Sequence, residues 1–95
     1  SLSDQDMQEV VKVMIKPLVA ITAEKGIALK FQPAALKLLA QEGFDPDMGA
    51  RPLRRLLQTK VEDRLAEMLL REEVGAGDQL KIGVSSGQLK FEVGR

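Results

Sequence analysis

Three arginines gather at the start of one predicted helix. Residues 49–55 read Gly-Ala-Arg-Pro-Leu-Arg-Arg, and proline in a first helical turn costs no hydrogen bond because that N–H would lack a partner anyway. Arg51, Arg54 and Arg55 therefore lie near a helix N-terminus, which is already partly positive and favours acids by up to ~1 kcal/mol. A helix N-terminus combined with a guanidinium group is suited to receiving a phosphate.

The composition excludes several kinds of chemistry. The chain has 95 residues, the length of one domain, and its 14 basic and 14 acidic residues leave no net charge that would favour nucleic acid or a membrane. It contains no cysteine and no histidine, which excludes disulfides, thiolate metal sites and imidazole acid–base catalysis. No apolar run approaches the ~20 residues of a membrane span. These features fit a cytoplasmic domain without a metal site.

The acidic residues do not form a recognisable catalytic pair. Glu62 and Asp63 are neighbours on a predicted helix and so point about 100° apart. Glu72 and Glu73 are typical of a solvated helix end. The chain also lacks the G-x-x-x-x-G-K-[ST] phosphate loop. We therefore expect that the isolated domain is not an enzyme.

Hydrophobic spacing predicts an α+β fold of three helices and a small three-stranded sheet, in the order α-β-α-α-β-β. The first helix follows a capping box at Ser3 and Asp6 and runs to about Lys25, with Pro17 either kinking it or dividing it in two. A short strand at 27–31 precedes a second helix at 33–43 and a third at about 50–71. Strands near 80–84 and 89–93 flank a turn at 85–87 and form a hairpin. The third helix carries one apolar stripe: Leu53, Leu56, Leu57, Val61, Leu65, Met68 and Leu69.

The residues alone leave two alternatives to a phosphate site open for the arginine cluster. The arginines could be surface charges paired with Asp45, Asp47 or Glu62. The order of elements is also that of a winged-helix nucleic-acid-binding module, with the basic helix entering the major groove. The zero net charge and the absence of lysine or arginine at the 85–87 turn count against the winged helix.

The segment from Gly43 to Arg55 resembles the sensor-2 segment of the Clp-type AAA+ unfoldases. The likeness extends loosely from Leu2 to Val93 and is greatest to the double-ring members, which comprise protease-partner unfoldases and the disaggregase. It implies that residues 1–95 are a single domain, the small C-terminal lid subdomain of the second ATPase module, cut from a larger protein.

The resemblance also implies roles for individual residues. Arg51 would reach the γ-phosphate of ATP held by the large subdomain, with Ala50 close to the nucleotide. Val11 or Ile15 would contact the adenine. Arg54 and Arg55 would form ion pairs with a neighbouring domain or subunit.

By the same resemblance, the parent protein is an ATP-hydrolysing homo-hexamer that uses Mg²⁺ and threads substrate protein through its pore. This subdomain would act as a lid and lever against the large subdomains of its own and the adjacent subunit. A Clp-type peptidase could bind through regions outside the chain. We expect no nucleotide on the isolated domain and neither nucleic acid nor membrane as a partner.

Overall fold

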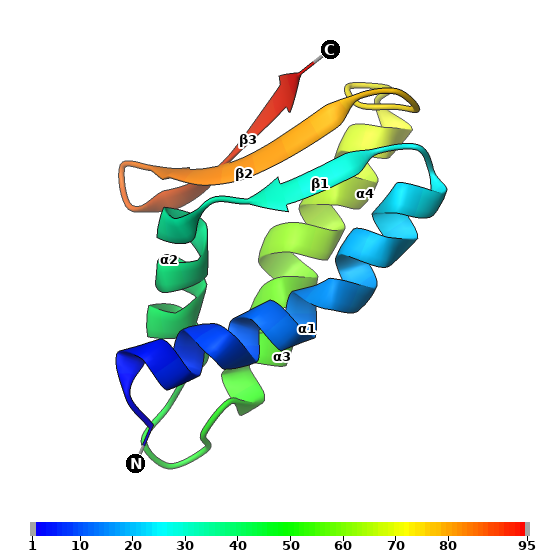
Figure 1. Ribbon diagram of the computed structural model, residues 1–95. Coiled ribbons are helices and arrows are strands. Elements are labelled where there is room, and N and C mark those ends of the chain that lie inside the picture. The colour runs from blue at the N-terminus through cyan, green and yellow to red at the C-terminus, as the bar shows by residue number, and fades with distance from the viewer. Residues whose placement is uncertain (1, 95) are drawn as a thin grey trace.

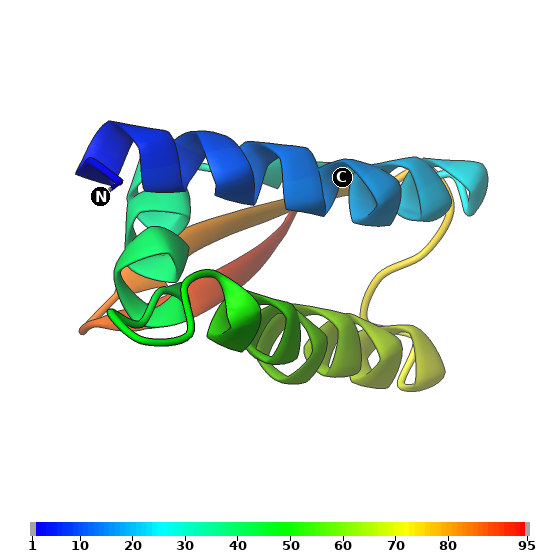
Figure 2. The same ribbon diagram turned by 90° about the horizontal axis from the view of Figure 1, so that it is seen from below.

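The computed structural model describes residues 2–94 and contains two layers, a sheet and a set of helices packed on one of its faces (Figure 1). The elements confirm the predicted α+β order. They are α1 (Asp4–Glu24), β1 (Ala28–Phe31), α2 (Pro33–Gly43), α3 (Arg51–Leu57), the π-helical segment η1 (Gln58–Glu62), α4 (Asp63–Leu70), β2 (Gln79–Ser85) and β3 (Gln88–Gly94). In Figure 2, α1 and the continuous helix α3–η1–α4 run side by side.

Helix α1 is a single helix that continues through Pro17, so the alternative of two shorter helices is wrong. It begins with the predicted capping box, in which the backbone N–H of Asp6 donates to Ser3 Oγ over 3.1 Å and the N–H of Ser3 donates to the Asp6 carboxylate over 3.3 Å. Proline has no N–H to offer the carbonyl of Val13, one turn earlier. Both residues are exposed, Val13 to 61%, so water can satisfy that carbonyl.

The sheet is mixed, with β2 in the centre. Strand β2 pairs with β1 in parallel and with β3 antiparallel, in the order β1-β2-β3. The hairpin between β2 and β3 turns at Ser86 and Gly87, whose φ angles of +52° and +74° are those of a type I′ turn. This geometry follows the right-handed twist of the strands, so the short turn fixes the register of the hairpin.

The hydrophobic core lies between the helices and the inner face of the sheet. Every element except β3 contributes buried side chains there, and β3 adds half-buried ones. The largest completely enclosed side chains are Ile27, Leu39, Leu53, Leu80, Ile82, Val11, Val61 and Thr22.

The predicted third helix is helical from Arg51 to Leu70 but includes an unexpected π turn at its centre. The N–H of Asp63 donates to the carbonyl of Gln58, five residues earlier, and the Thr59 hydroxyl donates to the carbonyl of Arg55 over 3.0 Å. The π turn thus holds one more residue than an α-helical turn.

The spacing of buried residues accounts for the π turn in this helix. Four of the residues facing the core are Leu53, Leu57, Val61 and Leu65, each four after the last, and Met68 follows three residues later. In a regular α-helix a step of four residues overshoots a full turn by about 40°, so three steps would rotate the apolar face by about 120°. One extra residue offsets about 100° of that drift, and the π turn therefore keeps all four side chains on the core.

The end of α2 and the start of α3 approach each other at Gly43. A Cβ atom on Gly43 would lie 3.1 Å from Cα and 2.9 Å from Cβ of Leu53. Gly43 and Leu53 are both buried, and Leu53 has no exposed surface. The missing side chain therefore lets the two helices meet and sets the position of the first turn of α3.

Replacing Gly43 with alanine is expected to destabilise the domain by about 1–3 kcal/mol, because the added methyl group would lie only 2.7 Å from Cδ1 and 2.9 Å from Cβ of Leu53. This expected loss of stability is opposite to the gain that usually follows when alanine replaces glycine inside a helix. Urea unfolding measures the difference, and Gly75→Ala is the matched control since a Cβ at residue 75 would have no other atom within 4 Å. A Gly43→Ala domain as stable as that control would contradict the close approach.

Replacing Pro17 with alanine is expected to stabilise the domain by roughly 1–3 kcal/mol, because it restores a backbone hydrogen bond in α1 and removes a poor helix former. Thermal unfolding followed by circular dichroism measures the change, with the exposed neighbour Lys16→Ala as control. Equal or lower stability of Pro17→Ala would show that the ring makes contacts that outweigh its cost to the helix.

Candidate functional site

The loop that delivers Arg51 is closed by its own hydrogen bonds. Asp45 and Gly49 exchange backbone bonds of 2.9 and 2.8 Å, and Gly49 adopts the left-handed φ of +64° that glycine accepts readily. The Asp45 carboxylate accepts from the N–H groups of Asp47 and Met48 over 2.7 and 3.0 Å. The loop therefore holds a fixed shape between α2 and α3.

The backbone at the start of α3 offers few free donors. The N–H of Arg51 donates to the carbonyl of Met48 over 3.3 Å, and that of Leu53 donates to the carbonyl of Ala50 over 3.0 Å. Pro52 has no N–H. Most of the positive character at this end therefore comes from the arginine side chains, more than from the helix terminus that the sequence suggested.

The three arginines are exposed and make no ion pair within residues 2–94. The predicted pairs with Asp45, Asp47 or Glu62 are therefore wrong, and the Asp45 carboxylate binds backbone N–H groups. Arg51 and Arg55 are four residues apart and so share one helix face, where like charges repel by ~0.2–0.5 kcal/mol. This unrelieved repulsion is what a site for an external anion or acidic partner would show.

Arg54 lies on another side of the helix, beside α1. It lines a groove of about 270 Å³ together with Glu62 of η1 and a set of mostly apolar side chains, namely Met14, Pro17, Leu18, Ile21 and Leu57. Ile21 is 53% exposed. An exposed apolar groove with one charge of each sign at its rim is suited to contact with another protein surface.

A second hollow lies at the end of the molecule that carries Ala50 and Arg51. It has a volume of about 440 Å³ and is lined by Leu2, Met7, Phe44, Asp45, Pro46 and Gly49. Figures 1 and 2 show that the N-terminus of α1 and the α2–α3 loop lie at this same end. The sequence did not predict this hollow, and the apolar residue Leu2 in its wall is 54% exposed.

The two α1 residues suggested by the resemblance lie in the domain core. Val11 has no exposed surface, and Ile15 is 8% exposed. Both pack with the other core residues. In this arrangement Ile15 is the one with surface available to a ligand.

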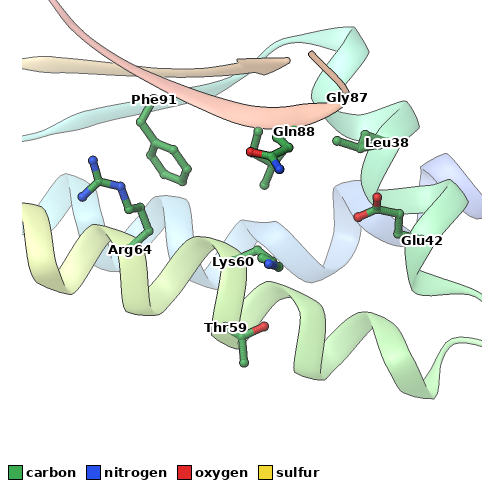
Figure 3. A pocket seen from close by; sticks show the side chains of 9 residues that line it. Leu38, Glu42, Thr59, Lys60, Arg64, Gly87, Gln88 and Phe91 are labelled. Atoms are coloured by element: carbon green, nitrogen blue, oxygen red, sulfur yellow. The ribbon is translucent and has the colours of Figure 1, made fainter. Parts of the chain in front are cut away.

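A third groove, of about 430 Å³, lies between α2, the α3–η1–α4 helix and the β2–β3 hairpin (Figure 3). Lys60 and Arg64 line it from the α3–η1–α4 helix, and Glu42 lines it from α2. The Arg64 guanidinium carbon lies 5.9 Å from the ring centre of Phe91, and its Nη1 donates to Glu67 over 3.1 Å. The contact with Phe91 joins α4 to β3, whereas the bond to Glu67 lies within α4.

Residues 2–94 contain no group of three acidic side chains placed to hold a metal ion. None of the helices in this part of the chain is both long enough and apolar enough to cross a membrane.

Comparisons with known proteins agree on one family. The family model described as the C-terminal, D2-small domain of ClpB protein matches residues 2–82. The chain is 37% identical over 92 residues to the chaperone protein ClpB of Rickettsia bellii, which covers 97% of this chain and 11% of that protein. It is 39% identical over 92 residues to the chaperone protein ClpB of Agrobacterium fabrum, covering 97% of this chain and 10% of that protein.

The chaperone protein ClpB of Helicobacter hepaticus is 40% identical over 84 residues, covering 88% of this chain and 10% of that protein. The chain thus spans about a tenth of the length of these relatives. The comparisons give no support to the winged-helix alternative. The α+β fold, the loop that fixes Arg51 and the match over residues 2–82 lead to one conclusion: the chain belongs to the ClpB D2-small domain family.

Proposed function

We propose that this domain is the nucleotide-sensing lid of an ATP-driven protein-unfolding chaperone, with Arg51 as the residue that senses the terminal phosphate. The observation that carries this proposal is that Arg51 is exposed, makes no ion pair within residues 2–94 and follows a loop of fixed shape. A guanidinium held in this way is always charged and can bind phosphate oxygens through two N–H groups at once.

The large subdomain of the parent protein would bind ATP or ADP with Mg²⁺, since this chain has no phosphate loop. This chain would contribute the Arg51 side chain, whose positive charge would contact the γ-phosphate of the nucleotide bound by the large subdomain. The γ-phosphate is the group that ATP has and ADP lacks. Ala50 would lie close to the nucleotide because it directly precedes Arg51 in the loop. The apolar hollow lined by Leu2, Met7 and Phe44 would then receive side chains of the large subdomain or the base.

The adenine contact predicted for Val11 or Ile15 remains part of this proposal, with Ile15 favoured by its small exposed surface. Arg54 and Arg55 would serve the interface with the large subdomain of the same or the adjacent subunit. The groove beside Arg54 supports that role, because its walls combine apolar surface with charge.

For the parent we propose a cytoplasmic, homo-hexameric ATPase that acts on substrate proteins. The relatives are named chaperones, which favours a chaperone over an unfoldase that delivers substrate to a peptidase. Binding and hydrolysis would rotate this rigid domain relative to the large subdomain, as domain closure does in other nucleotide-driven machines.

In the full-length parent protein, Arg51→Ala is expected to lower ATP turnover about tenfold or more, because one charge-assisted contact to the phosphate is lost. The isolated 95-residue domain carrying the same change should unfold within about 0.5 kcal/mol of the original, since Arg51 is exposed and unpaired in the described part of the chain. Steady-state turnover and urea unfolding measure the two effects separately.

The matched control is Arg71→Ala, which removes an exposed arginine from the opposite end of the same helix. Its turnover should stay within about twofold of the original. Normal turnover of Arg51→Ala, or equal losses in the two variants, would overturn the assignment of Arg51 as the sensor.

A further inference from the structure

Strand β3 is an edge strand whose outer side can be identified from the hydrogen bonds of β2. The N–H groups of Ala28 and Gln32 donate to the carbonyls of Asp78 and Ile82 over 3.1 and 2.8 Å. The even-numbered residues of β2 therefore direct their backbone groups toward β1. Because backbone groups alternate along a strand, the odd-numbered residues of β2 bond to β3.

The register then fixes which backbone groups of β3 point away from the sheet. The odd-numbered residues of β2 pair with Gln88, Lys90, Glu92 and Gly94. The N–H and C=O groups of Leu89, Phe91 and Val93 consequently point outward, and no hydrogen bond joins them to any other part of residues 2–94. An edge of this kind is a template for another strand.

We infer that this edge pairs antiparallel with β3 of a second copy of this chain, around a two-fold axis at Phe91. In this register the whole of β3, residues 88–94, overlaps the partner strand. Leu89 and Val93 of the two copies lie opposite each other, and each outward backbone group finds a complementary one. Lys90 faces the partner's Glu92, and Glu92 faces the partner's Lys90.

The two neighbouring symmetric registers give a shorter overlap of the strands and less favourable pairs of charges. An axis at Lys90 would place two lysines opposite each other, and an axis at Glu92 would do the same with two glutamates; both would shorten the overlap. Like charges directly opposite destabilise a pair of strands, whereas opposite charges stabilise it. The pairs at Lys90 and Glu92 would lie at positions without backbone bonds, where side chains come closest. Length of overlap and charge thus select the same register.

The inner face of the edge also fits a second copy. Phe91 would lie beside the partner's Phe91, and both rings are half-buried in the single chain. Figure 3 shows Phe91 directed toward Arg64 at the rim of the groove between the hairpin and the α3–η1–α4 helix. A paired strand would remove more of this ring from water, which adds apolar burial to the backbone bonds. This pairing involves β3 alone and does not depend on nucleotide.

Sedimentation equilibrium of the 95-residue chain from about 1 µM to 1 mM tests the inference. The unaltered chain should form a reversible dimer. Lys90→Glu and Glu92→Lys should each weaken dimerisation about tenfold or more, because each creates two like-charged pairs. An equimolar mixture of the two variants should recover a dimer, since the lysines of one copy then face the glutamates of the other. The double variant Lys90→Glu/Glu92→Lys should recover it as well.

Lys30→Glu is the control, because it makes the same change of charge on an exposed residue of β1, at the opposite edge of the sheet. It should leave the dimer unchanged within about twofold. Circular dichroism confirms that each variant is folded. A chain that stays monomeric at every concentration would overturn the inference, and so would a mixture and a double variant that dimerise as weakly as the single variants.

Discussion

The contact between Gly43 and Leu53 is the constraint on which the position of the candidate site depends. A Cβ at residue 43 would lie 2.7 Å from Cδ1 and 2.9 Å from Cβ of Leu53, so glycine at the end of α2 lets α3 begin directly against it. The 44–50 loop between these helices is short and closed by the Asp45–Gly49 bonds. Arg51 is therefore held at a fixed place relative to the core, although it makes no ion pair of its own among the described residues.

The π turn in the third helix extends the same constraint along the molecule. It keeps Leu53 and Leu57 on the core at one end and Leu65 at the other. With the core face fixed, Arg51 and Arg55 must point outward and Arg54 must lie beside α1. A regular α-helix of the same sequence would turn either the arginine end or the acidic end of the helix away from its present orientation. A rigid helix of this kind is suited to transmitting a change at Arg51 to the rest of the domain.

Much of this fold could be predicted from local patterns. The capping box at Ser3, the glycine of the hairpin turn and the alternating residues of β2 and β3 each specify structure within a few residues. The site was predicted through Arg51, because arginine at a helix start breaks an electrostatic rule. Other features depend on contacts between distant residues: the π turn, the hollow near Leu2 and the burial of Val11. Helix α1 continues through Pro17 where water can reach the unpaired carbonyl of Val13, and the sequence pattern does not reveal that exposure.

Comparing nucleotide affinities in the full-length parent tests whether Arg51 responds to the terminal phosphate. Binding of a non-hydrolysable ATP analogue and of ADP would be measured by titration calorimetry for the original protein and for Arg51→Ala. The affinity for the analogue should be about ten- to a hundredfold lower in the variant, with the affinity for ADP nearly unchanged. Equal losses for both nucleotides, or no loss for either, would contradict that role for Arg51.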